Sequence, residues 1–88
     1  MSKPTTITVI IPAFNAAPYI SRAIESALAQ TIPVLEILVV DDGSVDNTAE
    51  VVSRYSSPVR LLRQPNAGVG AARNYAAREA RGDRKSVV

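Results

Sequence analysis

Two adjacent aspartates, Asp41 and Asp42, follow an apolar run and precede Gly43 and Ser44. Neighbouring carboxylates repel each other and interrupt the hydrophobic pattern, so such a pair normally has a metal, a cation or hydrogen-bond donors as its partner. The segment is therefore a candidate for ligand binding. For a single aspartate, a structural role is the better explanation, because the carboxylate can cap the turn while Gly43 supplies a positive φ. For both aspartates together, that explanation is weaker.

A second candidate segment, Pro12-Ala13-Phe14-Asn15, also ends an apolar run. Phe14 is the only phenylalanine of the chain, and its ring either stacks on a base or packs against the helix expected to follow. Asn15 either contacts a ligand or caps that helix, and capping is the commoner role for a lone asparagine. The segment thus offers a ring and an amide to a flat, polar ligand.

A third segment, Gly68-Val69-Gly70-Ala71-Ala72-Arg73, carries two glycines at an expected helix start. A dinucleotide fingerprint needs a third glycine where Arg73 stands, and an acidic residue about 20 positions further on, so a nicotinamide cofactor is not expected. Gly68 and the helix amides can still approach a phosphate that Arg73 neutralises. A plain surface position for Arg73 is an equally good explanation.

Composition excludes several other kinds of chemistry. The 88 residues include no cysteine and no histidine, which rules out disulfides, thiolate or common zinc sites, and Ser-His or Cys-His nucleophile pairs. The net charge of +2 combines an acidic stretch over residues 1–53 with a basic one over residues 54–88. Because the arginines are scattered and stacking aromatics are nearly absent, we do not expect nucleic acid as a partner. Solvated arginines on helix and loop surfaces are the favoured explanation, and a polyanionic small molecule such as a diphosphate is intermediate between that and nucleic acid.

The order of apolar and amphipathic segments places the three candidate segments at one edge of a sheet. Short β-branched runs predict strands, and apolar residues at spacings of three and four predict helices. The expected elements are strands over 6–11, 36–40 and 59–63 and helices over 18–30, 46–55 and 69–80. This β-α-β-α-β-α order predicts an α/β fold with a Rossmann-like, parallel, three-stranded sheet. Ligands of such sheets bind beyond the carboxyl ends of the strands, where the candidate segments follow.

The ordered set of motifs resembles the N-terminus of family 2 glycosyltransferases. The resemblance covers residues 6 to about 82 and rests on residues 9–15, 23–31, 36–44, 46–48, 66–68 and 72–74. It implies the N-terminal part of a GT-A nucleotide-diphospho-sugar transferase fold, in an enzyme that transfers a sugar with inversion from a nucleotide-sugar, expected to be a UDP-sugar. The implied acceptor is a glycan or a lipid-linked sugar, in the biosynthesis of cell-envelope polysaccharide.

Carried onto this sequence, the resemblance implies a set of nucleotide-binding positions. Pro12, Ala13 and Phe14 would line the base pocket, with Phe14 stacking on a uracil-like ring. Asp42 would accept a hydrogen bond from the ring N–H, and Asp41 would orient the turn or contact the ribose. The full set that we predict is Pro12, Ala13, Phe14, Asn15, Asp41, Asp42, Gly43, Ser44, Gly68 and Arg73.

The last residues depart from the family pattern. In the family, an apolar strand ending in an Asp-x-Asp metal motif follows, and a general base comes later; here residues 83–88 read Asp-Arg-Lys-Ser-Val-Val. GATCGGAAGAGCGTCGTG encodes this hexapeptide and matches a widely used sequencing adapter. We therefore expect a truncated nucleotide-binding domain over 1–82 and a non-native tail over 83–88. The chain would then be inactive, with no catalytic or metal-binding residue, and Mg²⁺ or Mn²⁺ would act only in the intact enzyme.

Other functions and the location stay open at this point. Val39 to Ser44 faintly resembles the strand-end aspartates of haloacid-dehalogenase-like phosphatases and of response regulators, and a non-catalytic nucleotide-binding module is a further alternative. No apolar stretch approaches the roughly 20 residues of a membrane-spanning helix, so none is expected in this chain. We expect a cytoplasmic protein, with peripheral membrane association of the full-length enzyme left open. A three-stranded sheet would leave residues 7–11 as an exposed, aggregation-prone edge.

Overall fold

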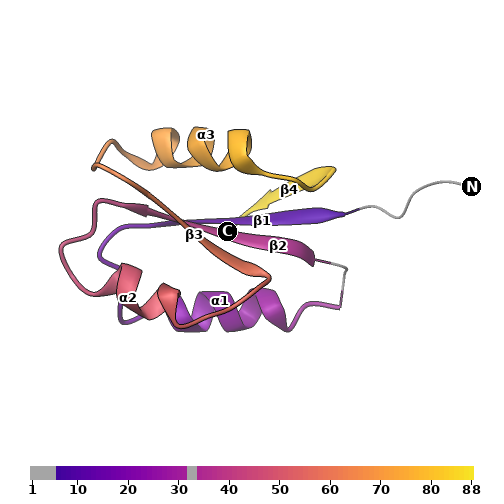
Figure 1. The fold of residues 1–88 in the computed structure, drawn as a ribbon, viewed down its shortest axis with the longest axis horizontal. Coiled ribbons are helices and arrows are strands. Elements are labelled where there is room, and N and C mark those ends of the chain that lie inside the picture. Colours follow the sequence, from indigo (N-terminus) through magenta and orange to yellow (C-terminus); the bar gives the residue numbers. More distant parts are fainter. Residues whose placement is uncertain (1–5, 32–33) are drawn as a thin grey trace, which may run out of the picture.

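A computed structural model describes residues 6–31 and 34–88; residues 1–5 of the expected domain lie outside it. The described part is an α/β fold with a parallel four-stranded sheet in the order β3-β2-β1-β4. Figure 1 shows α3 on one side of this sheet and α1 and α2 on the other. The elements are β1 (Ile7–Ala13), α1 (Ile20–Leu28), β2 (Val34–Asp42), α2 (Thr48–Ser53), β3 (Val59–Gln64), α3 (Val69–Glu79) and β4 (Arg84–Val87).

Strict alternation along the two central strands builds a core on each face of the sheet. On one face, Val9, Ile11, Ile37 and Val39 pack with residues of α1 and α2. On the other, which we call the α3 face, a smaller core contains Ile10, Leu38, Val40, Leu62, Ala72 and Ala76. Because both faces are covered, β1 and β2 are apolar at consecutive positions, as expected for a buried parallel strand.

The sheet has four strands, so the expectation of three was wrong. Residues that we expected to form a tail provide β4, whose Arg84–Val87 pairs with Ile7–Ile10 of β1. β4 therefore covers the edge of β1 that we expected to be exposed, although its own four residues are exposed. Parallel pairing needs only backbone groups, which is why this basic segment could pair without an apolar pattern. The adapter origin of residues 83–88 stays a proposal, and the sequence of the source DNA tests it.

Pro12 lies inside β1, one residue past the expected end of the strand. The carbonyl groups of Thr6 and Ile10 accept hydrogen bonds from the N–H groups of Arg84 and Val88, at 3.0 and 2.9 Å. The backbone N–H and C=O groups of the even-numbered residues of β1 therefore point toward β4. β4 ends at Val87, before it reaches the level of Pro12. Pro12 therefore lies at the end of this ladder, where a strand tolerates a proline.

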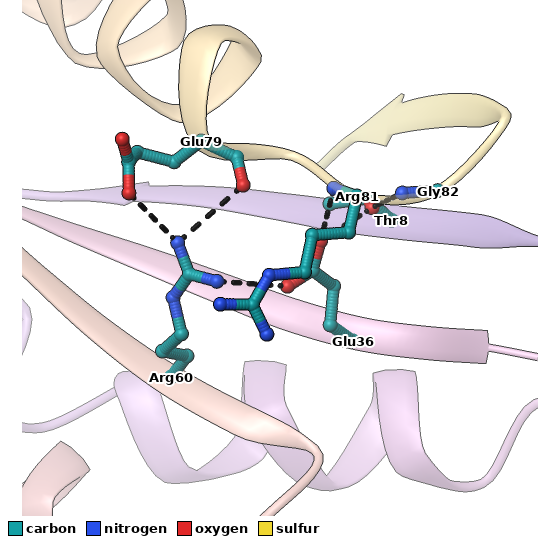
Figure 2. A network of polar contacts seen from close by, with 6 residues as sticks. All are labelled: Thr8, Glu36, Arg60, Glu79, Arg81 and Gly82. Atoms are coloured by element: carbon teal, nitrogen blue, oxygen red, sulfur yellow. Dashed lines mark hydrogen bonds and ion pairs between the residues drawn. The ribbon is translucent and has the colours of Figure 1, made fainter.

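A polar cluster under the end of α3 ties this helix to the sheet (Figure 2). The buried carboxylate of Glu36 accepts hydrogen bonds from the Thr8 hydroxyl at 2.9 Å and the Arg81 N–H at 2.6 Å. Its other oxygen pairs with Arg60 Nη1 at 3.4 Å, and Arg60 also pairs with Glu79 of α3 at 3.0 Å. The chain leaving α3 is thereby directed into β4 beside β1.

Candidate functional site

The three segments that the sequence singled out meet at the carboxyl end of the sheet. They enclose a cavity of about 310 Å³ between β1, β2 and the start of α3, lined by Pro12, Ala13, Phe14, Asp42, Asn66, Gly68, Val69 and Ala72. Five of these residues belong to the predicted set: Pro12, Ala13, Phe14, Asp42 and Gly68. The expected convergence is thus present, while the binding of a nucleotide there stays a prediction.

Phe14 follows directly on β1 and is about half exposed. The residue is 51% exposed and lines the cavity together with Val69 and Ala72 of α3. Packing against the first helix, the alternative that we considered, would have buried the ring. An accessible aromatic ring beside an apolar wall can stack on a flat, aromatic ligand.

Asp42 is the charged residue that lines the cavity, and its carboxylate accepts hydrogen bonds from three donors. Its Oδ1 accepts from Gln64 Nε2 at 2.9 Å and from the Ala67 N–H at 2.8 Å, and its Oδ2 accepts from the Gly68 N–H at 3.0 Å. A carboxylate offers about four lone-pair positions, so one acceptor position remains on Oδ2. The hydrogen bonds from Gln64, Ala67 and Gly68, that from Gln64 foremost, lower the pKa of Asp42 against the opposing effect of desolvation. Asp42 is therefore an ionised group that can only accept.

Asp41 belongs to the other side of the sheet. Strand alternation directs consecutive side chains to opposite faces, so the two aspartates do not confront each other as their adjacency suggested. Asp41 is 1% exposed; its Oδ1 accepts from the Ser44 N–H at 3.1 Å, and its Oδ2 lies 3.5 Å from Arg63 Nε. Of the two roles considered for Asp41, the geometry matches the orienting of the turn, and Asp41 is not among the cavity-lining residues.

Gly43 and Gly68 fix the backbone around the cavity. Gly43 has a φ of +73°, and a Cβ there would lie 2.6 Å from the backbone nitrogen of Asn66, so a side chain would push the two loops apart. Gly68 precedes α3 with a φ of +96°, a conformation that directs its N–H to Asp42. Gly43 thus acts by permitting close loop contact, and it is not among the residues that line the cavity.

Asn15 and Ser44 form a clip between two loops behind the cavity. The Asn15 N–H donates to Ser44 Oγ at 2.9 Å, and Asn15 Oδ1 accepts from the Val45 N–H at 2.9 Å. Next to them, Asp46 accepts from the Ala17 N–H at 3.2 Å and from Thr48. The hydrogen bond from the Thr48 hydroxyl is the main cause that lowers the pKa of Asp46.

The expectation that Asn15 caps the first helix was wrong. α1 begins five residues later, at Ile20, without a side-chain cap. The loop-to-loop contacts compete for the Asn15 side chain, and its φ of +50° suits an asparagine in a turn. Asn15 and Ser44 therefore hold the segment that bears Phe14, rather than lining the cavity.

Arg73, the last of the predicted residues, lies outside the cavity, whereas several residues that were not predicted belong to the site. Arg73 lies on α3 next to Ala72, but it is exposed and does not line the cavity. The prediction omitted Gln64 and Asn66, whose amides donate to Asp42 Oδ1 and to the Asp42 carbonyl, and the apolar pair Val69 and Ala72. The register of β3 against β2 brings Gln64 beside Asp42, and no spacing in the sequence predicts that contact.

The two aspartates at the end of β2 do not form a site for a divalent cation. Among residues 6–31 and 34–88, no three Asp, Glu, His or Cys side chains gather where they could hold a metal ion. Asp41 and Asp42 face opposite sides and are occupied by an arginine and by hydrogen-bond donors, so they cannot chelate one ion together. Both carboxylates are buried, Asp41 to 1% and Asp42 to 5% exposure.

Comparison with known proteins assigns the chain to a family. The sequence model described as glycosyl transferase family 2 matches residues 8–88. The chain belongs to this family. Over 79 residues it is 43% identical both to a chondroitin synthase of Pasteurella multocida (strain Pm70) and to a hyaluronan synthase of Pasteurella multocida, covering 86% of this chain and 8% of each relative.

Solved structures place the fold of this family 2 chain among GT-A glycosyltransferases. S. aureus TarS 1-349 in complex with UDP-GlcNAc superposes with a TM-score of 0.85 at 31% identity, over 94% of this chain and 26% of that one. The mannosyltransferase PcManGT from Pyrobaculum calidifontis, in complex with GDP-Man and Mn²⁺, gives a TM-score of 0.82 at 31% identity, over 93% and 26%. The chain thus spans about a quarter of these two structures and 8% of the two synthases. None of the helices in its described part is long and apolar enough to cross a membrane.

Proposed function

We propose that the cavity beside Phe14 and Asp42 binds the base of a UDP-sugar, in an intact enzyme that transfers the sugar with inversion to an acceptor hydroxyl. The observation that carries the proposal is the pairing of an open aromatic ring with an ionised carboxylate that keeps one acceptor position free. Family membership and the UDP-GlcNAc in the similar TarS structure support the ligand class.

The chemistry of the cavity favours uracil over cytosine. Uracil carries an N–H at ring position 3, which can donate to the free position on Asp42 Oδ2 while the ring stacks on Phe14. Cytosine has an unprotonated nitrogen at that position, so two hydrogen-bond acceptors, the ring nitrogen and the carboxylate, would face each other. This arrangement costs more binding free energy than the mere absence of a hydrogen bond, because both acceptors lose their water without gaining a donor.

The other parts of the reaction are proposed for the intact enzyme alone. Mg²⁺ or Mn²⁺ would there neutralise the leaving diphosphate, as Mn²⁺ accompanies GDP-Man in PcManGT. The acceptor would be a glycan or a lipid-linked sugar, in line with the polysaccharide synthases among the relatives. We place the enzyme in the cytoplasm, and we propose that this chain, which spans a small part of its relatives, holds the nucleotide without transferring sugar.

Titration of the chain with UDP and CDP tests the base assignment, followed by amide chemical shifts without added metal. UDP should shift the signals of Phe14, Ala67 and Gly68 and bind at least about tenfold more tightly than CDP. The two ligands carry the same phosphates, so any difference comes from the base. Equal affinities, or shifts confined to the arginines, would contradict the proposal.

Activity measurements test the claim that the chain alone does not transfer sugar. With UDP-GlcNAc, Mn²⁺ and an oligosaccharide acceptor, the chain should release no UDP above the background of a sample without protein. A parallel incubation with acetyl phosphate should leave Asp41 and Asp42 unmodified by mass spectrometry. Turnover in the first assay would refute inactivity, and a phosphorylated aspartate in the second would favour phosphotransfer.

A further inference from the structure

Gln64 ends the edge strand β3 and pairs in register with Asp42 of β2. Its Nε2 donates to Asp42 Oδ1 at 2.9 Å, while Gln64 itself is half-buried and does not line the cavity. We propose that Gln64 is a positioning residue, which fixes the rotation of the Asp42 carboxylate so that its one free acceptor position is presented to the base. The inference rests on the proposed binding of uracil at Asp42.

The geometry around Asp42 shows why a third donor is needed. The N–H groups of Ala67 and Gly68 approach from the start of α3, one to each oxygen. The terminal torsion of an aspartate is broad, so two contacts from one side leave the carboxylate free to rock. Gln64 approaches from β3 and occupies the second position on Oδ1. Only Oδ2 then keeps a free lone pair, and the acceptor has one defined direction.

An amide is the side chain that does this without altering the charge of the site. A lysine or arginine would neutralise Asp42 and compete for its last acceptor position, whereas a glutamine donates and stays neutral. Near Asp42, the other charged groups of the surrounding elements are Asp41 of β2, which is paired with Arg63 of β3, and the exposed Arg73 of α3. The remaining charged residues of these elements lie toward their opposite ends: Glu36, Arg60, Arg78 and Glu79. The cavity residues of β1 and the loop after it carry no charge.

Gln64→Glu turns this contact into a pH-dependent one. At neutral pH the new carboxylate repels Asp42, and the Asp42 side chain should rotate away from the base. Repulsion raises the pKa of the coupled pair, so on acidification one proton binds between the two groups. The protonated group then donates to the other, which restores the original contact.

The experiment measures uridine affinity of the 88-residue chain by amide chemical shifts, near neutral pH and at about pH 5. Uridine has no phosphate that titrates in this range, so the profile reports the protein. We expect Gln64→Glu to bind about tenfold more weakly than wild type at neutral pH and to recover most of that loss at the acidic pH. Wild type should bind equally at both, because Asp42 stays ionised throughout.

Two further variants separate positioning from structural damage. Gln64→Met keeps the length of the side chain without a donor and should bind weakly at both pH values. Gln30→Glu makes the same charge change at an exposed position outside the cavity and should bind like wild type. If wild type binds uridine and Gln64→Glu matches it, or stays weak after acidification, the positioning role is refuted. If wild type binds neither uridine nor UDP, the proposed function fails first, and this inference fails with it.

Discussion

At each end of helix α3, a carboxylate of β2 accepts hydrogen bonds from the adjoining chain, and the two carboxylates differ in their surroundings. At the end of the helix, Glu36 receives the Thr8 hydroxyl, the Arg81 N–H and Arg60. At its start, Asp42 receives Gln64 and the N–H groups of Ala67 and Gly68, and it also lines a cavity. The comparison teaches that burial and hydrogen bonding do not by themselves distinguish a structural carboxylate from a binding one.

The difference lies in the neighbours of the two groups. Glu36 lies beside the positive charge of Arg60, which also pairs with Glu79. The chain that leaves α3 donates the Arg81 N–H to Glu36. Asp42 has only neutral donors, and it lines a cavity beside a half-exposed aromatic ring. We therefore expect changes at Glu36 to act on stability alone and changes around Asp42 to act on binding.

The largest effect should come from Glu36→Gln. The amide keeps one acceptor oxygen, which can serve Thr8 and Arg81 in place of Oε2; its NH2 group then faces Arg60, which loses its charged partner in a buried site. We expect a loss of about 2–3 kcal/mol in the free energy of unfolding, measured with urea. Glu50→Gln makes the same change in the exposed pair with Arg54 and should cost less than about 0.5 kcal/mol. If the Glu36→Gln variant folded but lost uridine affinity, the assignment of Glu36 to stability alone would be contradicted.

Gly43→Ala should affect both properties. The added Cβ would meet the Asn66 backbone at 2.6 Å in a left-handed conformation. We expect a loss of about 2 kcal/mol in stability and weaker uridine binding, because the loop that carries Gly68 must move. Gly70→Ala is the matched control, since nothing lies within 4 Å of a Cβ there, and it should gain up to about 1 kcal/mol. Unchanged unfolding of Gly43→Ala would show that the contact between the loops is dispensable.

Phe14→Ala should change binding while leaving the fold intact. Stacking of a base on an aromatic ring contributes about 1–3 kcal/mol, so uridine affinity should fall at least about fivefold. The ring is half-exposed, and its loss should hardly alter the urea midpoint. Tyr19→Ala removes an aromatic side chain that is 72% exposed and outside the cavity, and it should leave uridine affinity unchanged. Equal affinities of the two variants would remove Phe14 from the binding site.

The smallest effect should be the dependence of stability on acid. The folded-state pKa of Asp42 lies below its ordinary value, so the stability that this carboxylate adds is complete above about pH 4 and is lost as the pH falls through the lowered pKa. Melting temperatures should thus decline below about pH 4 in wild type and less steeply in Asp42→Asn. Asp46, whose pKa is also lowered, contributes in the same direction, so Asp46→Asn serves as the comparison. Parallel curves for wild type and Asp42→Asn would contradict the assignment.

Local patterns predicted most of the elements. The apolar runs predicted strands that the structure shows as Ile7–Ala13, Val34–Asp42 and Val59–Gln64. Helix ends were less accurate: α2 ends at Ser53, two residues before the predicted Tyr55. The fourth strand was missed because Arg84–Val87 has no apolar pattern and gains its place from backbone pairing and from the contacts of Glu36 and Thr8 near Gly82.

The sequence by itself determined the α/β class, the parallel sheet and the meeting of three loops at one edge, because hydrophobic periodicity and right-handed crossovers are encoded locally. Tertiary structure decided which polar residues face the cavity. Strand alternation separated Asp42 from Asp41, and the register between β2 and β3 supplied Gln64. Loop contacts drew Asn15 and Ser44 into a clip. The contacts of Gln64 and of Asn15 join residues more than 20 positions apart, and no local pattern specifies such pairings.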